Sequence, residues 1–71
     1  MYDDYNDYLI KVKIGLFKTM YVEYIDWDTN TVYYTKDRDF AGDFGSYGRA
    51  LEICEMLERI PEVSYAEVVV V

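Results

Sequence analysis

Alternating apolar and polar positions begin at Tyr8. From Tyr8 to Ile14, every second residue is apolar, and lysines fill two of the positions between them. A period of two is typical of a strand with one buried face. The pattern therefore predicts a first strand over residues 8–14.

Two further β-rich runs follow, each after a turn signal. Residues 15–18 can reverse the chain at Gly15, and residues 20–27 are rich in β-branched and aromatic side chains. This second run is apolar on both sides, so the pattern does not define its buried face. The polar residues 28–31 predict a hairpin turn with Asn30 in a left-handed position, followed by a third strand over residues 32–35.

A helical period appears after residue 45. Ser46 is a good N-cap, and the helix is expected to reach about Ile60, because the residue before Pro61 disfavours helical dihedral angles. Apolar residues spaced three and four apart predict the face toward the core. They are Tyr47, Ala50, Leu51, Cys54 and Leu57, widened by Ile53 and Ile60. The glutamates at positions 52, 55 and 58 are predicted on the outer face.

The remaining segments are a long connection and a final strand. Residues 36–45 are polar and rich in glycine, and Phe40, Ala41 and Phe44 are expected to pin this loop to the core. Residues 63–71 are rich in valine and predict a fourth strand, which we expect beside the first strand and parallel to it.

These elements predict one α+β domain over residues 1–71. The order β-β-β-α-β gives a four-stranded, mainly antiparallel sheet of order 3-2-1-4, with the helix packed on one face. Residues 1–7 contain three acids and little aliphatic content, so we expect a flexible N-terminal segment.

Composition narrows the classes of function. The chain of 71 residues has no histidine and one cysteine, Cys54, which excludes triad-type catalysis and zinc sites built from cysteine and histidine. A four-stranded sheet with one helix also encloses little space for a substrate. We therefore expect a protein that is not an enzyme and has no cofactor or metal. With no export signal or membrane span, the expected compartment is the cytoplasm.

Two motifs resemble ligand sites but are incomplete. Asp26, Asp28, Asn30 and Asp37 follow part of the spacing of a calcium loop, but its required glycine and bidentate glutamate are missing. A plain hairpin turn is the alternative. The three glycines at 42, 45 and 48 precede a helix as in phosphate-binding loops, but no lysine follows them and nearby aspartates would repel phosphate.

Acidity suggests the kind of partner. The net charge is −7, with fourteen acids and seven bases, which disfavours direct nucleic-acid binding and favours a protein with a basic surface. Trp27 is expected to be partly exposed and to stack on an arginine of that partner. The candidate partner-binding residues are Asp26, Trp27, Asp28, Asp37, Asp39, Asp43, Glu52, Glu55 and Glu58.

A loose resemblance covers residues 35–53. Thr35-Lys36-Asp37, followed by Ala41, Phe44, Ser46, Ala50 and Ile53, resembles a pattern in small acidic phage and prophage accessory proteins of Gram-positive bacteria. Such proteins include anti-defence inhibitors, anti-CRISPR proteins among them. The resemblance implies an inhibitor in the host-cell cytoplasm. We therefore expect binding to a host nucleic-acid-handling protein such as a nuclease, with the acids occupying its basic groove as a DNA mimic.

An assembly function is the alternative. In that case the chain would self-associate, for instance as a homodimer, or dock through a sheet edge and its tyrosines, and the acidity would serve only solubility.

Overall fold

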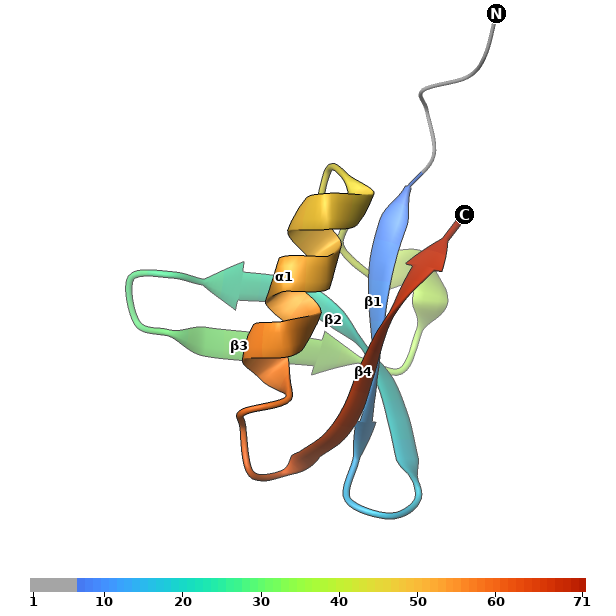
Figure 1. The fold of residues 1–71 in the computed structure, drawn as a ribbon. Helices are drawn as coiled ribbons and strands as arrows, with labels where there is room; N and C mark the ends of the chain where they lie inside the picture. Colours follow the sequence, from blue (N-terminus) through green and yellow to red (C-terminus); the bar gives the residue numbers. More distant parts are fainter. Residues whose placement is uncertain (1–6) are drawn as a thin grey trace, which may run out of the picture.

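The computed structural model describes residues 7–71, which form a four-stranded antiparallel sheet with one α-helix on one face (Figure 1). The elements are β1 (Tyr8–Ile14), β2 (Lys18–Asp26), β3 (Thr31–Thr35), the 3-10 helix η1 (Arg38–Phe40), α1 (Tyr47–Leu57) and β4 (Val63–Val70). The strand order is β3-β2-β1-β4. The predicted α+β class and the order 3-2-1-4 are confirmed.

The predicted flexible segment falls mostly outside the described residues. Its last member, Asp7, is described and exchanges two backbone hydrogen bonds with Val71, with N to O distances of 3.3 and 2.9 Å. The ladder between β1 and β4 therefore extends to Asp7, one residue before the predicted start of the ordered domain.

The direction of β4 differs from the prediction. β4 pairs with β1 in the antiparallel sense, from Tyr8 opposite Val70 to Ile14 opposite Val63. The reason is the loop after β3, which returns the chain to the start of β1, where Phe44 N donates to Tyr8 O over 3.1 Å. α1 then runs along the sheet, and the short turn after it sends β4 back against β1 (Figure 1).

A β-bulge resolves which face of β2 is buried. Val22 lies opposite Tyr34 and Tyr24 lies opposite Tyr33, so Glu23 is an extra residue in β2. The extra residue shifts the alternation by one position. As a result Val22 and Ile25 both point into the core, and the rings of Tyr24 and Tyr33 stack at 6.0 Å between centroids.

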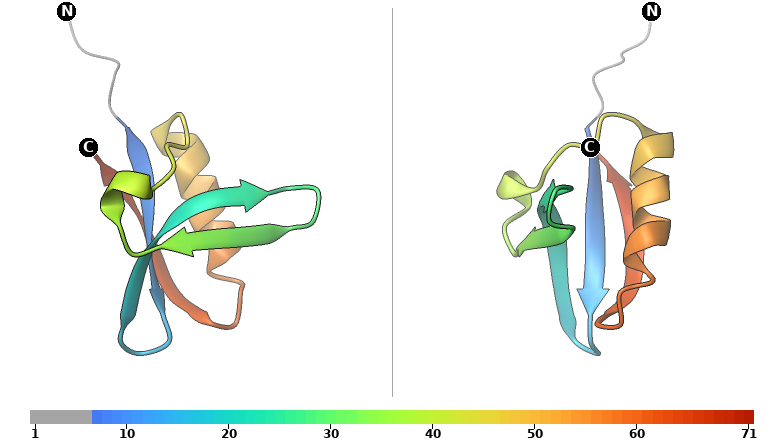
Figure 2. Two further views of the ribbon diagram at one scale, coloured as in Figure 1. Left: turned by 180° about the vertical axis from the view of Figure 1, so that it is seen from behind. Right: turned by 90° about the vertical axis from the view of Figure 1, so that its left-hand side faces the viewer.

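The two central strands of the sheet, β1 and β2, separate over part of their length. β1 and β2 pair only from Lys11 opposite Tyr21 to Ile14 opposite Lys18, next to their turn. Beyond that stretch, the loop of residues 41–44 lies between the two strands, because Gly42 N donates to Val22 O over 3.0 Å and Phe44 N donates to Tyr8 O. The loop passes from η1, on the face of the sheet opposite α1, to the start of α1 (Figure 2).

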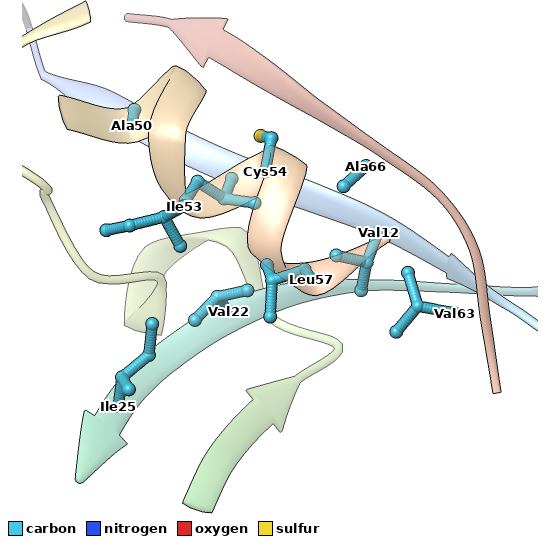
Figure 3. Close-up of a cluster of buried hydrophobic side chains, with 10 residues drawn as sticks. Val12, Val22, Ile25, Ala50, Ile53, Cys54, Leu57, Val63 and Ala66 are labelled. Atoms are coloured by element: carbon cyan, nitrogen blue, oxygen red, sulfur yellow. The ribbon is translucent and has the colours of Figure 1, made fainter. Parts of the chain in front are cut away.

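The core lies between α1 and the sheet (Figure 3). Its buried side chains are Ile10, Val12, Val22, Ile25, Ala50, Ile53, Cys54, Leu57, Val63 and Ala66. Phe44 packs against this cluster as predicted, but Phe40 is 64% exposed and does not pin the loop. Tyr47 and Leu51, predicted on the buried face of α1, are also exposed.

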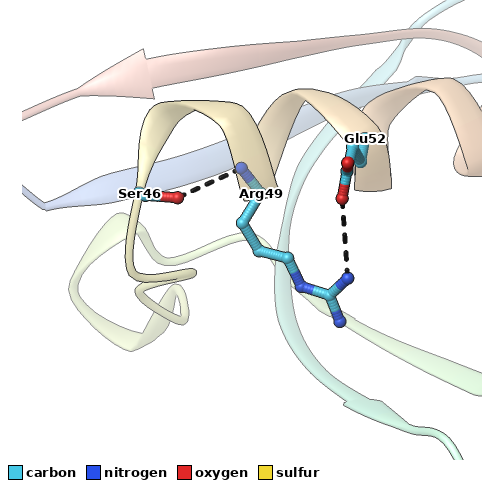
Figure 4. A network of polar contacts seen from close by, with 3 residues as sticks. All are labelled: Ser46, Arg49 and Glu52. Carbon is cyan, nitrogen blue, oxygen red and sulfur yellow. Dashed lines mark hydrogen bonds and ion pairs between the residues drawn. The ribbon is translucent and has the colours of Figure 1, made fainter.

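A side chain caps the first turn of α1, and backbone hydrogen bonds close its last turn. Ser46 is the predicted N-cap, and its Oγ accepts a hydrogen bond from Arg49 N over 3.1 Å (Figure 4). At the other end α1 stops at Leu57, earlier than predicted, because the last turn tightens: Arg59 N and Ile60 N donate three residues back.

Candidate functional site: an acidic groove beside Trp27

The open side of β2 forms a groove lined mainly by acids and aromatic rings. Its volume is about 410 Å³. The lining comes from the second half of β2, the turn after it and the loop that fills the split in the sheet: Glu23, Tyr24, Ile25, Asp26, Trp27, Asp28, Gly42, Asp43 and Phe44. We call this the acidic groove. Four carboxylates line it, and no lysine or arginine is among its lining residues.

Trp27 forms the ridge of this groove. It is 47% exposed, which confirms the predicted partial exposure. Trp27 also lines a smaller apolar pocket of about 240 Å³, together with Val32, Met56 and Ile60 among others. The ring therefore offers a large apolar surface next to carboxylates.

An arginine of the chain itself already contacts this ring. The Arg49 guanidinium carbon lies 5.3 Å from the centroid of Trp27, within the range of a cation–π interaction. The same guanidinium is 3.8 Å from Glu52 Oε1 (Figure 4). Both groups of this ion pair are exposed, so its contribution to stability is small. Stacking of a partner's arginine on Trp27 stays a prediction.

Three of the predicted aspartates form local turns with the backbone. Oδ1 of Asp26 accepts from Asp28 N, Oδ1 of Asp37 accepts from Asp39 N, and Oδ1 of Asp43 accepts from Gly45 N. Each bond spans two residues, which is the geometry of an Asx turn. Asp26 and Asp37, two members of the pattern that resembled a calcium loop, thus form turns. A third member, Asn30, lies in the left-handed region at φ 56°.

Asp43 is the most constrained carboxylate of the groove. Its Oδ1 accepts from Gly45 N and also from Tyr8 N, both over 3.1 Å. Hydrogen bonds to the charged form favour ionisation, and the bond from Gly45, followed by that from Tyr8, lowers the pKa of Asp43 below 3.8. Asp43 therefore stays negatively charged while it joins the loop to the start of β1.

The predicted site residues do not form one surface. Asp26, Trp27, Asp28 and Asp43 line the acidic groove. Asp37 and Asp39 belong to the η1 segment on the face opposite α1 (Figure 2). The three glutamates of α1 lie outside both groups.

The glutamates of α1 do not form a uniform acidic row. Three residues turn a helix by 300°, so each step of the series moves 60° around the axis. Glu52 is paired with Arg49, and Glu55 is exposed. Glu58 reaches the sheet, where its Oε2 accepts from Ala66 N over 3.2 Å.

No family model, curated protein or solved structure matches this chain.

Sequence reasoning missed five of the nine groove residues: Glu23, Tyr24, Ile25, Gly42 and Phe44. Glu23 enters the lining at the β-bulge, and a bulge has no signature in a run that is apolar on both sides. Phe44 was expected only to pin the loop to the core. Its side chain packs on the core and also lines the groove. The Asp-x-Asp and Asp-x-Gly spacings were the available signal for the three Asx turns.

Other reactive features are sparse in the part of the chain that the structure describes. No three residues among histidine, cysteine, aspartate and glutamate are grouped so that they could hold a metal ion. Burial, followed by the charges of Glu58, Glu67 and Glu55, raises the pKa of the Cys54 thiol to about 11. The thiol is therefore protonated at neutral pH and a poor nucleophile. Residues 7–71 contain no helix that has the length and apolar character needed to span a bilayer.

Proposed function

We propose that the protein is a small inhibitor of the phage anti-defence type, similar in role to anti-CRISPR proteins. It binds a host nucleic-acid-handling protein, such as a nuclease, in the host cytoplasm. It acts without catalysis, and the acidic groove receives a basic segment of the partner that otherwise contacts nucleic acid.

The acidic groove is the observation that supports this proposal. Glu23, Asp26, Asp28 and Asp43 line one concave surface, and none of them forms an ion pair with a lysine or arginine within residues 7–71. Unpaired carboxylates attract a cationic segment and raise its rate of association. Trp27 and Tyr24 provide rings on which an arginine can stack.

The proposed binding surface covers only the acidic groove, and the whole molecule is not proposed to imitate duplex DNA. Glu52 is paired with Arg49, and Glu58, the C-cap of α1, is directed toward β4, where its Oε2 accepts from Ala66 N. Of the three predicted glutamates, only Glu55 is exposed without such a contact. The proposal therefore rests on the acidic groove and not on the glutamates of α1.

Affinity capture with competition by DNA tests the proposal. Immobilised protein is incubated with bacterial extract, and bound proteins are eluted either with duplex DNA or with inorganic phosphate at the same phosphate concentration. We expect DNA to release a nucleic-acid-binding protein that phosphate leaves bound, because DNA and the immobilised protein bind the same basic surface of that partner. Capture should also fall steeply with salt.

A matched pair of variants locates the binding site. Asp26→Lys with Asp28→Lys reverses two groove charges, whereas Asp37→Lys with Asp39→Lys reverses the same motif on η1, outside the groove. We expect about tenfold or greater loss of capture for the first pair only, because close charge pairs across an interface are worth a few kcal/mol. Equal loss in both pairs, or no DNA-sensitive protein at all, would contradict the proposal.

Trp27→Ala tests the aromatic ridge. A central aromatic anchor contributes about 2 kcal/mol or more to binding, which corresponds to about 30-fold in affinity. The substitution should cost less stability than the loss of a core side chain, since Trp27 is half-exposed. Titration of the purified partner measures the affinity. An unchanged affinity would remove Trp27 from the contact surface.

A further inference from the structure

The turn between β1 and β2 exposes two adjacent apolar side chains. Leu16 is 76% exposed and Phe17 is 92% exposed. They follow Gly15, whose φ of 66° lies in the left-handed region. Single exposed apolar residues are common, but two neighbours at the end of a hairpin form a patch that suits a binding contact.

Hydrogen bonds to the start of β4 and to the residue before it hold this turn in place. Gly15 N donates to Glu62 O over 3.0 Å. Ser64 Oγ lies 3.1 Å from Lys13 O and 2.9 Å from Gly15 O, so its hydroxyl can donate to either carbonyl. The exposure of Leu16 and Phe17 is therefore built into the hairpin and does not result from a loose loop.

The same hairpin carries a concentration of positive charge. Residues 8–22 contain Lys11, Lys13 and Lys18 and no acid, in a chain whose net charge is −7. Lys13 and Lys18 are exposed and form no ion pair with any described residue. We call Lys13, Leu16, Phe17 and Lys18 the basic tip.

The basic tip and the acidic groove are complementary in charge and in apolar character. The groove presents unpaired carboxylates beside Trp27, Tyr24 and Phe44, and the tip presents unpaired ammonium groups beside Phe17. Within one molecule they are separated along β2. Lys18 and Glu23 are five residues apart, or about 16 Å at 3.3 Å per residue, and Phe17 lies beyond Lys18.

We propose that the basic tip of one molecule docks into the acidic groove of a second copy. Phe17 packs on the aromatic side chains at the groove, and Lys13 and Lys18 pair with its carboxylates. The inference rests on the proposed function, in that the groove receives a cationic segment, and it names the second copy as one source of that segment. Self-association and the basic partner then compete for the groove.

The proposed contact has a defined symmetry. Tip and groove are different surfaces, so a single tip-to-groove contact is heterologous: one molecule of the pair keeps a free groove and the other keeps a free tip. Such a contact continues into short open chains or rings as the concentration rises. A closed homodimer with a twofold axis would require both tip-to-groove contacts to form at once between the same two molecules.

Sedimentation velocity over a range of protein concentrations tests self-association. We expect the mean mass of the wild type to rise with concentration, and the association to weaken about tenfold or more at high salt. Phe17→Ser with Lys18→Glu removes the tip, and Asp26→Lys with Asp28→Lys reverses the groove. Each variant alone should stay monomeric. Phe40→Ser, which removes an exposed ring outside both surfaces, is the control and should associate like the wild type.

Mixing the two variants gives the decisive measurement. The tip variant retains an intact groove and the groove variant retains an intact tip, so the mixture should form complexes that stop at two chains. Circular dichroism of each variant verifies that it is folded. A monomeric wild type at every concentration, or a mixture that stays monomeric, would overturn the inference.

Two further outcomes separate this inference from its alternatives. If the wild type is monomeric but binds vesicles of anionic lipid through Phe17, the tip is a membrane contact and the inference fails. If self-association is absent while groove reversal still abolishes DNA-sensitive capture, the inference fails and the proposed function stands. If the tip variant loses capture of the host protein and the groove variant does not, the tip binds the host partner and the inference is overturned.

Discussion

Single aspartates in this protein combine two roles. Asp26 and Asp43 line the acidic groove, and each also accepts a hydrogen bond from a backbone N–H two residues further on. A carboxylate used this way is fixed in position, so less side-chain entropy is lost when a cation approaches it. The two Asx turns at Asp26 and Asp43 therefore help to preorganise the acidic groove.

Leu57→Ala tests the assignment of the core at one residue. Leu57 is fully buried between α1 and the sheet, and truncation of a buried leucine costs about 2–5 kcal/mol. Leu51→Ala is the matched control, since the same change on the same helix removes an exposed side chain. Urea unfolding should show a large loss for Leu57 and a much smaller one for Leu51. Similar losses would show that the buried face of α1 is wrongly assigned.

The sequence predicted the centre of the helical stripe better than its margins. Ala50, Ile53, Cys54 and Leu57 are buried as expected, because spacings of three and four define one direction on a helix. Leu51 lies about 100° around the axis from Ala50, and a sheet with only four strands does not extend far enough to cover it. The width of a covered face depends on the opposite layer, which the helical sequence alone does not contain.

Among the elements, the loop between β3 and α1 decides the architecture. It crosses the face opposite α1 at η1, passes between β1 and β2, and delivers the chain to the start of β1 (Figure 2). That route reverses the direction of β4 relative to the prediction. It also places Gly42 and Asp43 beside the open edge of β2, where they complete the acidic groove.

Gly42→Ala tests how closely this loop packs on the bulge of β2. A Cβ at this position would lie 2.6 Å from the backbone oxygen of Glu23, so strand or loop must move, at a cost of about 1–3 kcal/mol. Gly48→Ala is the matched control, because a Cβ there meets nothing within 4 Å and alanine favours the helix by about 0.5–1 kcal/mol. Thermal unfolding should shift in opposite directions. A neutral Gly42→Ala would contradict the close packing.

The elements were more predictable than their connections. The first strand was predicted with its observed bounds, and the hairpin turn at Asn30 was identified from its residue types. The bulge at Glu23 depends on how β2 pairs with β3, and the route of residues 41–44 depends on contacts between segments about twenty residues apart, as between Gly42 and Val22. The acidic groove is formed at that junction, so the sequence predicted several of its residues but not the groove itself.

Over the whole molecule, positive and negative side chains gather in different regions. Cations concentrate on the hairpin of β1 and β2, and acids gather at the other end of β2 and along the turns. The only ion pair within residues 7–71 joins Arg49 to Glu52. Stability therefore depends on the core and on titrating groups near it rather than on salt bridges.

Stability should decline at alkaline pH. Burial and then nearby glutamates raise the pKa of Cys54 from 9.0 to about 11, and burial followed by Glu62 raises that of Tyr34 above 10.0. The folded protein holds these protons more tightly than the unfolded chain does. The contribution of Cys54 is therefore complete below pH 9.0 and is lost as the pH rises toward about 11, and that of Tyr34 is lost as the pH rises above 10.0.

Urea unfolding across that pH range measures the effect. The free energy of unfolding should fall between pH 9.0 and about 11 in the wild type, and the fall should be shallower in Cys54→Ala, which lacks the thiol. Comparing slopes cancels the constant packing loss of the substitution. Parallel slopes would show that Cys54 does not titrate differently in the two states.

The position of β1 at the centre of the sheet has a consequence for folding during synthesis. β1 pairs with β2 only near their turn and with β4 along its whole length, and β4 leaves the ribosome after the other three strands of the sheet. Until then one edge of β1 has no partner, and an open strand edge favours intermolecular aggregation. Lys11 and Lys13 lie on this strand, where charged side chains act as gatekeepers against such pairing. The same lysines that give the hairpin its positive charge thus protect the nascent chain.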